Sequence, residues 1–206
     1  MTPKMNDEKE NLEHKQKMQD KKSAVDDRIK NAKDKKGLIL ILTGDGKGKS
    51  SSAFGMVARA LGHKMHCGVV QFIKGAMSTG EERFFSRFPD EVEYHVTGDG
   101  YTWNTQDREG DIATAERGWK VAKSMLGNPE FDLIVLDELN IVLDLAYLDL
   151  DTVINDLQSR PERQHVIITG RSAPEKLIGI ADTVSEMSLI KHAFEKGIQA
   201  QKGIEL

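Results

Sequence analysis

Cysteine, aromatic side chains and long hydrophobic runs are all scarce in this sequence. Only one cysteine, Cys67, is present, so an internal disulfide framework is excluded and a reducing compartment is expected. No apolar run is long enough to cross a bilayer, and the N-terminus lacks the apolar core of a signal peptide. The formal net charge of −4 offers no strong positive field to nucleic acid. These absences predict a cytoplasmic protein with neither a membrane nor a nucleic acid as its partner.

The sequence also shows no recognisable metal site built from histidines and no recognisable catalytic triad. The six histidines show no spacing typical of metal ligands, and no serine–histidine–aspartate arrangement can be argued from the sequence. The composition, 38% hydrophobic and 30% charged, is that of an ordinary globular protein. The 206 residues are enough for one domain with a sizeable core.

Two regions of different composition divide the chain. Residues 1–36 form a polar arm, which is expected to be partly disordered up to about residue 22, with a short helix starting at Ser23. Residues 37–206 alternate between strand patterns and helical patterns. The predicted strands span 38–43, 68–73, 92–96, 133–136, 166–169 and 183–187, and the predicted helices span 51–61, 107–126, 151–160 and 174–181.

Several of these strands are continuous apolar runs, which suits strands that are covered on both faces. Strand–helix alternation of this kind predicts a mostly parallel sheet with helices on both faces. Ligands in such sheets bind at the carboxyl ends of the strands. The residues that follow the strands are therefore the candidates for a site.

The most informative stretch follows the first predicted strand. A glycine-rich turn ends there in a lysine and a hydroxyl residue, the order of a nucleotide-binding phosphate loop. Glycines let backbone N–H groups converge on phosphate oxygens, the Lys49 ammonium adds charge, and the Ser50 hydroxyl can ligate Mg²⁺. The positive N-terminal end of the next helix would face the same phosphates. The predicted nucleotide-binding residues of the loop are Gly44, Asp45, Gly46, Lys47, Gly48, Lys49, Ser50 and Ser51.

This loop is shorter than the common pattern. Gly44 is followed by three residues before Gly48, where the usual motif has four, and Lys47 adds a second lysine. The backbone cradle is therefore expected to be related to the usual one but not identical. A chance glycine-rich turn is disfavoured because the flanking strand and helix are both predicted. Together with the alternating pattern, the loop indicates an α/β fold of the P-loop NTPase (RecA-like) type.

Acids follow the strand predicted at 133–136. Asp137 and Glu138 stand where a carboxylate can hold Mg²⁺ next to the Ser50 hydroxyl. Successive residues of a strand point to opposite sides, so the two acids are expected to have different roles. The alternative is an acidic cap for the next segment.

Three further features have both a structural and a functional interpretation. Arg59, on the helix after the loop, is either a solvated residue or a phosphate contact at a subunit boundary. Arg171 ends another strand at the same edge, where it either meets the nucleotide or lies at the surface. Tyr101 and Trp103 stand two residues apart in a polar loop. They either plug the core or offer a flat apolar surface to a planar ligand.

Taken in order, these motifs resemble the P-loop type of ATP:corrinoid adenosyltransferase. The resemblance covers almost all of residues 37–206, and the shortened phosphate loop is itself a mark of that family. The stretches that carry it are 43–50, 69–75, 101–106, 135–139, 168–171 and 191–194.

The resemblance implies a reaction in which the Co(I) of a corrinoid attacks the 5′ carbon of ATP. The corrinoid is cobalamin, cobinamide or cobyrinic acid a,c-diamide, and the products are an adenosyl–cobalt bond and triphosphate, in adenosylcobalamin synthesis or salvage. Family members hold ATP reversed relative to other P-loop enzymes. Positive charge from Lys47, Lys49 and Mg²⁺ (or Mn²⁺) would stabilise the leaving group. By the match, the metal ligands are Ser50 and Glu138, with Asp137 nearby.

The resemblance also assigns the aromatic pair and the partners. In the family, a Phe and a Trp at the positions of Tyr101 and Trp103 cover the lower face of the corrin ring and displace its lower axial ligand. The resulting four-coordinate Co(II) is more easily reduced; here Tyr stands in place of the usual Phe. Arg59 matches an arginine that contacts ATP. A homodimer is implied, with a reduced, flavodoxin-like flavoprotein as electron donor and an N-terminal segment that can fold over the corrinoid.

Other functions stay open on the residues alone. An ordinary P-loop kinase or ATPase needs only the loop and the acids, but it leaves the aromatic loop unexplained. A non-catalytic module that binds ATP and a corrinoid would bind both ligands without turnover. A nucleic-acid-handling ATPase is weaker, because no basic stripe is apparent. The identity of the phosphate product distinguishes the kinase or ATPase from the adenosyltransferase, and a lack of turnover with both ligands bound distinguishes the binding module.

Overall fold

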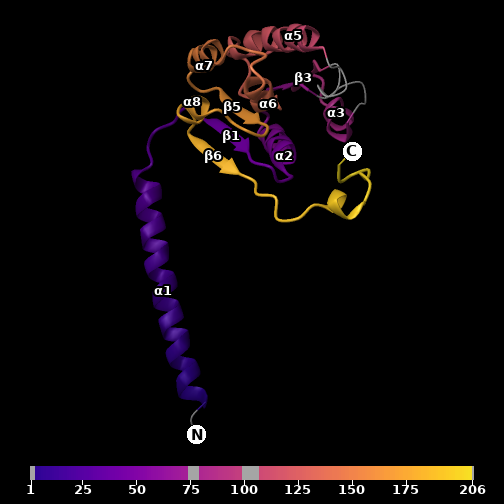
Figure 1. Cartoon of the computed structure of the whole chain (residues 1–206). Coiled ribbons are helices and arrows are strands. Elements are labelled where there is room, and N and C mark those ends of the chain that lie inside the picture. Colours follow the sequence, from indigo (N-terminus) through magenta and orange to yellow (C-terminus); the bar gives the residue numbers. More distant parts are fainter. Residues whose placement is uncertain (1–2, 74–78, 99–106, 206) are drawn as a thin grey trace. The chain divides into compact units, whose positions relative to one another are not determined.

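Six parallel strands form one sheet in the computed structural model, in the order β3-β2-β4-β5-β1-β6. Every pair of neighbouring strands is parallel. The strands are β1 (Ile39–Thr43), β2 (Cys67–Gln71), β3 (Val92–Val96), β4 (Leu133–Asp137), β5 (His165–Thr169) and β6 (Thr183–Glu186). Figure 1 shows this sheet with its surrounding helices. The predicted α/β fold with a parallel sheet is confirmed.

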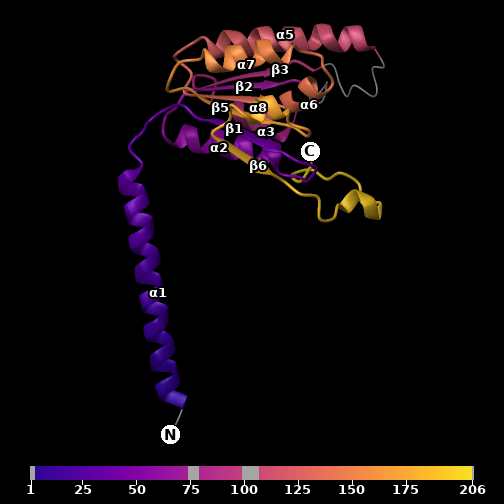
Figure 2. The same ribbon diagram turned by 60° about the vertical axis from the view of Figure 1, so that its left-hand side comes forward.

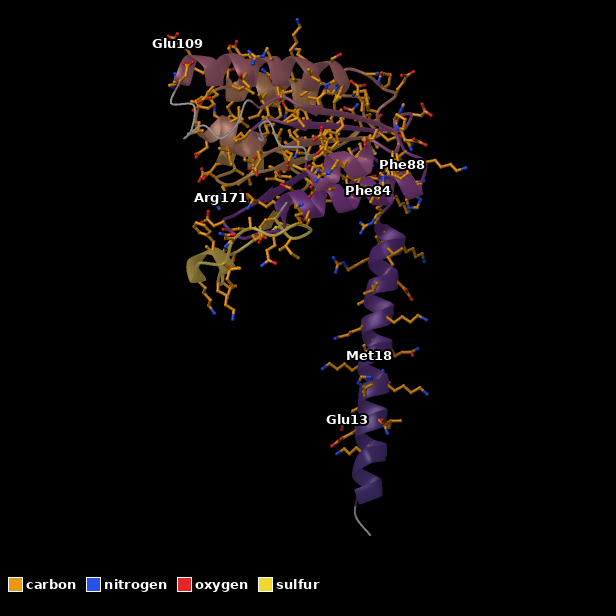
Figure 3. All side chains as sticks on the ribbon, turned by 90° about the vertical axis from the view of Figure 1, so that its right-hand side faces the viewer. Glu13, Met18, Phe84, Phe88, Glu109 and Arg171 are labelled. Atoms are coloured by element: carbon orange, nitrogen blue, oxygen red, sulfur yellow. The ribbon has the colours of Figure 1, made fainter. Side chains whose placement is uncertain are left out.

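The structure describes residues 3–73, 79–98 and 107–205, and it divides the chain into two compact units, Met1–Lys35 and Lys36–Leu206. The described residues of the first unit form a 29-residue helix, α1 (Pro3–Asn31). From Lys9 onward its side chains are exposed, and Figure 3 shows them projecting to either side of the helix. The helix begins well before Ser23, the predicted start. Lys, Glu, Gln and Met favour a helix, but without an apolar stripe no periodic pattern announces it.

In the second unit, side chains of successive strand residues alternate between two hydrophobic cores, one on each face of the sheet. Ile41 and Ile168 pack on the side of α5, α6, α7 and α8, whereas Leu42 and Ile167 pack on the side of α2 and α3. Figure 2 shows α5 and α7 on one side of the strands and α2 on the other. These helices are α2 (Lys49–Gly62), α3 (Gly80–Phe85), α5 (Arg108–Leu126), α6 (Leu139–Asp144), α7 (Leu150–Gln158) and α8 (Glu175–Ile178). Side chains that alternate between two cores, with every residue of β2 and β4 buried, are what strands covered on both faces require.

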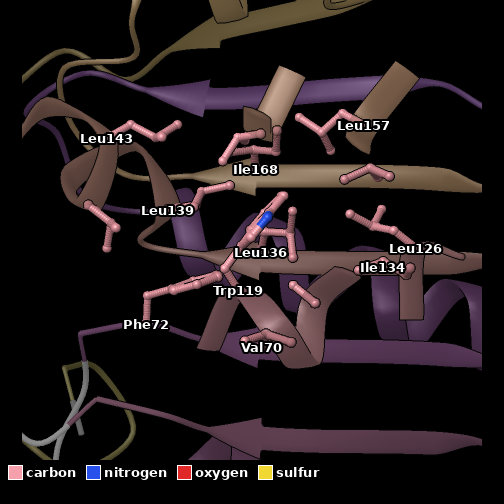
Figure 4. Packing of buried hydrophobic residues seen from close by; sticks show 14 of the residues in the cluster. Val70, Phe72, Trp119, Leu126, Ile134, Leu136, Leu139, Leu143, Leu157 and Ile168 are labelled. Carbon is pink, nitrogen blue, oxygen red and sulfur yellow. The ribbon is translucent and has the colours of Figure 1, made fainter. Parts of the chain in front are cut away.

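The larger core, on the α5 side, is built around side chains from the middle of the sheet (Figure 4). Ile134, Leu136 and Ile168 are fully buried there, and each such side chain contributes roughly 1.5–3 kcal/mol relative to exposure. Trp119 of α5 joins the same cluster, and its indole N–H donates to the Asp156 carboxylate of α7 over 3.1 Å. The polar group of the ring is thereby satisfied while its apolar body packs on the strands.

The connections from the neighbouring strands β1 and β5 diverge. The chain leaves β1 through α2 toward β2, whereas it leaves β5 through α8, on the opposite face, toward β6. Such a switch point opens a crevice at the carboxyl ends of the strands, where ligands bind. Because β5 lies between β1 and β4, the acidic end of β4 is roughly 10 Å from the end of β1.

The predicted strands and helices of the second unit are all present, with ends that differ by no more than three residues. Three short elements were not predicted: α3, α6 and the 3-10 helix η1 (Ala193–Lys196), which are six, six and four residues long. Segments this short cannot display a helical period. Among the helices of the described residues, none has both the length and the apolar composition that spanning a bilayer demands.

Asp182 connects the start of β1 to the segment before β6 through an ion pair and a hydrogen bond. Its carboxylate pairs with the Lys36 ammonium at 2.5 Å and accepts the N–H of Ile39 at 2.9 Å. These two contacts hold the pKa of Asp182 below its usual range. A carboxyl whose pKa is lowered on folding stabilises the fold above its unfolded pKa, about 3.9, and loses that contribution as the pH falls through the folded pKa.

We therefore expect Asp182→Asn to lower the free energy of unfolding by about 1 kcal/mol at pH 7. The difference from the wild type should shrink below pH ~4, as measured by urea unfolding across that range. Asp151→Asn is the control, because its carboxylate pairs with Lys176 at an exposed position and should contribute little. A difference that stays the same down to pH ~3 would contradict the assigned role of the charge.

Candidate functional site

A cavity of about 590 Å³ opens at the carboxyl ends of the strands. Its size is within the range of about 300–1,000 Å³ that is typical of small-molecule sites. The phosphate loop, the ends of β4 and β5 and the C-terminal segment all contribute to its wall. The predicted residues that line it are Asp45, Gly46, Lys47, Gly48, Lys49, Ser50, Ser51, Glu138 and Arg171.

The phosphate loop is pressed against the chain that follows β6. Gly44 and Gly48 have φ angles of 91° and 111°, in the left-handed region that disfavours a side chain. A Cβ atom on Gly44 would lie 2.6 Å from the carbonyl oxygen of Met187, and one on Gly46 would lie 2.6 Å from that of Ser188. The N–H of Gly46 donates to the Met187 carbonyl over 2.6 Å. Close backbone packing, as well as the turn itself, therefore requires these glycines.

Helix α2 begins directly after the loop, and its first three residues line the cavity. Its N-cap, Gly48, makes no side-chain hydrogen bond, and no acid stands in its first turn. No carboxylate of that turn therefore neutralises the positive end of the helix dipole or caps its first N–H groups. On its other side, Ala53 and Val57 are fully buried against the sheet. The packing of α2 thus aims an anion-binding terminus at the cavity.

Lys49 is the buried cation of this site, with 9% of the residue exposed. Its ammonium donates to the carbonyl oxygens of Gly44 and Gly46 over 2.6 and 2.7 Å, which closes the loop around it. Burial lowers the pKa of Lys49, and the nearby Glu138 carboxylate opposes that shift. A cation held in this way presents a fixed positive charge to a ligand in the cavity.

The two acids after β4 have different surroundings, as the alternation of a strand predicts. Asp137 is fully buried, and its carboxylate accepts the Thr169 hydroxyl and the Gln71 amide, both over 2.7 Å. Glu138 instead lines the cavity. Its backbone N–H donates to the Thr169 hydroxyl over 2.9 Å.

Two residues at the cavity wall adopt a left-handed backbone without being glycine. Glu138 has φ 65° and Ser172 has φ 52°, at the ends of β4 and β5. Such conformations cost of order 1–3 kcal/mol each and persist only where the surroundings enforce them. They concentrate at functional sites, in keeping with the position of both residues beside the cavity.

The oxygen donors of the cavity suit a divalent ion that binds together with phosphate. Ser50, which carries a hydroxyl, and Glu138, which carries a carboxylate, both line the cavity. Within the described residues there is no group of three or more His, Cys, Asp or Glu side chains that could hold a metal alone. Mg²⁺ usually takes one or two carboxylates from a protein and completes its shell with phosphate oxygens and water. The residues present therefore fit Mg²⁺ or Mn²⁺ in that manner.

The remaining predicted residues have different fates. Arg171, labelled in Figure 3, lines the cavity, and its Nε lies 3.8 Å from Oδ1 of Asp45. Arg59 is exposed in the last turn of α2, roughly 15 Å along the helix from Lys49. A single chain, as far as it is described, does not bring Arg59 into the cavity. Tyr101 and Trp103 lie outside the described residues.

The C-terminal segment also contributes to the cavity, which was not predicted from the sequence. His192, Ile204 and Glu205 line the cavity. The Glu205 carboxylate lies 3.7 Å from the Lys47 ammonium and accepts the N–H of Gln201 over 2.9 Å. His192 belongs to one of the stretches that carry the family resemblance, but a lone acid near the C-terminus has no spacing that marks it.

Comparison with known proteins gives consistent results over nearly the whole chain. The family model of the ATP:corrinoid adenosyltransferases BtuR/CobO/CobP matches residues 35–206. A corrinoid adenosyltransferase of Pseudomonas aeruginosa is 62% identical over 192 residues, which cover 93% of this chain and 95% of the relative. One from Sinorhizobium sp. is 46% identical over 200 residues, 96% of this chain and 94% of the relative. The corrinoid adenosyltransferase CobA of Salmonella typhimurium is 45% identical over 192 residues, 93% of this chain and 97% of the relative.

The contact between Glu205 and Lys47 places a carboxylate where a polyphosphate would be attracted. We expect Glu205→Gln to bind inorganic triphosphate about two- to fivefold more tightly than the wild type. The variant removes a carboxylate that competes with the anion for Lys47 and repels it. The effect is modest because this carboxylate is partly exposed to solvent. Isothermal titration calorimetry at low ionic strength measures this. Glu195→Gln is the matched control, since Glu195 lies on the same segment in η1 but is not among the residues that line the cavity. Weaker binding by the Glu205 variant would mean that the carboxylate supports the anion site.

Proposed function

The chain belongs to the ATP:corrinoid adenosyltransferase family, and on that premise we propose that it transfers the 5′-deoxyadenosyl group of ATP to the Co(I) of a corrinoid. The cobalt electron pair forms a bond to the 5′ carbon, and the bond from that carbon to the 5′ oxygen breaks. The electron pair of the broken bond leaves on triphosphate. The corrinoid is cobalamin, cobinamide or cobyrinic acid a,c-diamide, and the product serves adenosylcobalamin synthesis or salvage.

One observation carries this proposal: a single cavity gathers a shortened phosphate loop, the start of α2 and the acid that follows β4. The triphosphate is the leaving group, so catalysis depends on stabilising the negative charge that develops on it. Lys49 is buried at the base of the loop and supplies fixed charge. Lys47 and Arg171 also line the cavity, and their long, partly exposed side chains add positive charges that can move to contact the phosphates. The N–H groups of the loop and of α2 orient the chain of phosphates.

The divalent metal ion of the proposed reaction would bind the same triphosphate leaving group. We assign Ser50 and Glu138 as its protein ligands, because both line the cavity, and we assign Asp137 to a supporting position, because its carboxylate is buried on Thr169 and Gln71. When bound, Mg²⁺ or Mn²⁺ supplies charge neutralisation to the phosphate oxygens. The residues of the chain hold the phosphates in place and keep the 5′ carbon directed toward the corrinoid.

Other parts of the proposal rest on the family resemblance. Tyr101 and Trp103 would cover the lower face of the corrin ring and displace its axial ligand, which makes Co(II) easier to reduce. The electron donor is a reduced, flavodoxin-like flavoprotein. The N-terminal arm, residues 1–36, would cover the corrinoid. The buried single thiol of Cys67 fits a reducing compartment, and we place the reaction in the cytoplasm.

A homodimer is proposed as well, with a specific reason in this chain. Arg59 is expected to contact ATP, yet it lies in the last turn of α2, away from the loop of its own chain. A second copy could present its Arg59 to the cavity of the first. The dimer therefore explains how this arginine reaches the nucleotide.

Competing functions predict other products from the same cavity. A kinase or ATPase would use the loop and Glu138 to release ADP or phosphate. A non-catalytic module would bind ATP and a corrinoid without product. Neither function accounts for a phosphate loop that is one residue shorter than the common motif. That shortened loop is a mark of the adenosyltransferase family, whose members hold ATP in the reversed direction.

The test is an anaerobic assay of the full chain with ATP, Mg²⁺ and chemically reduced cob(I)alamin. We expect adenosylcobalamin and triphosphate in equal amounts, and Lys49→Ala should reduce turnover by at least about 10²-fold, because it removes the buried charge that faces the leaving group. Glu195→Gln is again the control outside the cavity. ADP or phosphate without adenosylcobalamin would assign the chain to the kinases and ATPases, and tight binding of both ligands without turnover would assign a binding module.

Trp103→Ala separates reduction from transfer. We expect a loss of at least about tenfold when Co(II) is reduced by a flavoprotein, because the lower ligand would then stay bound. With chemically prepared Co(I), the loss should be small. Initial rates of adenosylcobalamin formation under the two conditions provide the comparison. Equal losses in both assays would exclude a role of the indole in ligand displacement.

A further inference from the structure

Four polar side chains from four neighbouring strands form a continuous hydrogen-bonded series across the sheet. The Tyr94 hydroxyl of β3 donates to the Gln71 Oε1 of β2 over 2.8 Å, and the Gln71 Nε2 donates to Oδ2 of Asp137, at the end of β4, over 2.7 Å. From the other side, the Thr169 hydroxyl at the end of β5 donates to Oδ1 of Asp137 over 2.7 Å. The Thr169 oxygen in turn accepts the backbone N–H of Glu138 over 2.9 Å.

The direction of every bond in this series follows from the chemistry of its members. The Asp137 carboxylate accepts from the amide nitrogen of Gln71, which leaves the amide oxygen of Gln71 to accept from Tyr94. A hydroxyl has one proton, which Thr169 gives to Asp137, so its lone pairs face the N–H of Glu138. Gln71, Asp137 and Thr169 are all fully buried, where a polar group that loses its partner is expensive. Each hydrogen bond from Tyr94 to Glu138 therefore has one fixed direction, and breaking any of them would leave a buried polar group without its partner.

The end of the series coincides with the strained residue of the site. Glu138 has φ 65° and ψ 16°, and no side-chain bond caps the helix that follows it. A glutamate reaches the left-handed region only where its surroundings hold it there. The bond from its N–H to Thr169 is a contact that fixes the orientation of the peptide between Asp137 and Glu138. That peptide sets the direction in which the Glu138 side chain leaves the strand end.

We propose that Thr169 is a positioning residue for the Glu138 carboxylate, with Asp137 and Gln71 holding the Thr169 hydroxyl in its orientation. The inference rests on the proposed function, in which Glu138 ligates the divalent ion. Thr169 does not touch the ion or the nucleotide. It acts by keeping Glu138 in the left-handed conformation that directs its carboxylate into the cavity.

The test measures how much metal the protein needs to bind ATP, so it does not depend on turnover. ATP binding to the full chain is titrated by isothermal calorimetry at a series of Mg²⁺ concentrations and in EDTA. Thr169→Val keeps the shape of the side chain but removes the hydroxyl. We expect it to raise the Mg²⁺ concentration for half-maximal ATP binding by about tenfold or more, the usual effect of losing a group that orients a metal ligand. ATP affinity in EDTA should change by less than about twofold, because the phosphate loop is untouched.

Two further variants make the result specific. Thr169→Ser keeps the hydroxyl and should restore the Mg²⁺ dependence of the wild type. Thr114→Val is the matched control, since Thr114 is a buried threonine of α5 outside the cavity wall, and it should leave both affinities unchanged. If Thr169→Val does not fold, as judged by thermal unfolding without ligand, Thr169→Cys replaces it. The thiol is a weaker donor and acceptor, and a shift of at least about threefold is then expected.

The possible failures are distinguishable. If the wild type binds ATP in a Mg²⁺-dependent manner and Thr169→Val shows the same dependence, the positioning role is overturned while the proposed function stands. An equal loss of affinity with and without Mg²⁺ would also overturn it, because Thr169 would then shape the nucleotide site as a whole. If the wild type itself shows no Mg²⁺-dependent ATP binding, the metal assignment of Glu138 fails, and the inference fails with it.

Discussion

Burial of the parallel sheet on both faces is the constraint on which the rest of this structure depends. Every residue of β2 and of β4 is buried, and a hydrophobic core lies on each side of the sheet. Because an unpaired polar group is costly in such surroundings, polar chemistry is confined to the ends of the strands. The ends of β1, β4 and β5 meet at one edge, and there the phosphate loop, Glu138 and Arg171 gather around a single cavity.

Two buried polar residues of the second unit show how this constraint is met, although the Oε1 atom of Gln164 has no hydrogen-bond partner among the described residues. Asp137 satisfies its carboxylate with Thr169 and Gln71, and Gln164 directs its amide nitrogen to three backbone carbonyls, those of Met125, Asn128 and Phe131. The two cases differ in position. Gln164 joins the end of α5 and the loop before β4 at the amino-terminal edge of the sheet, whereas Asp137 lies at the carboxyl edge beside the cavity. Hydrogen bonding of buried polar groups therefore produces a structural contact at one edge and a support for the site at the other.

The fold and the glycine-rich turn after β1 could be predicted from the sequence because both depend on local patterns. Apolar runs such as residues 133–136 and the turn from Gly44 to Ser50 are contiguous, and their meaning does not require any distant partner. The extent of α1 was missed because a helix without an apolar face has no period to detect. The roles of Thr169 and Glu205 could not be found, since each depends on a residue far away in sequence, Asp137 and Lys47 respectively. Tertiary pairing of that kind leaves no trace in spacing.

The net charge of the cavity lining explains why the proposed function would need a divalent metal ion. Its described lining contains three cations, Lys47, Lys49 and Arg171, against five carboxylates, Asp45, Glu81, Glu138, Asp144 and Glu205. A lining with more acids than bases repels a polyphosphate as a whole, although Lys49 and the start of α2 attract it locally. The divalent cation of the proposed function would reverse that balance, because it would make Glu138 a ligand in place of a repelling group and would neutralise phosphate oxygens at the same time. In the proposed function, the acids of this wall would make nucleotide binding conditional on the metal, whereas a purely basic cavity would bind triphosphate without it.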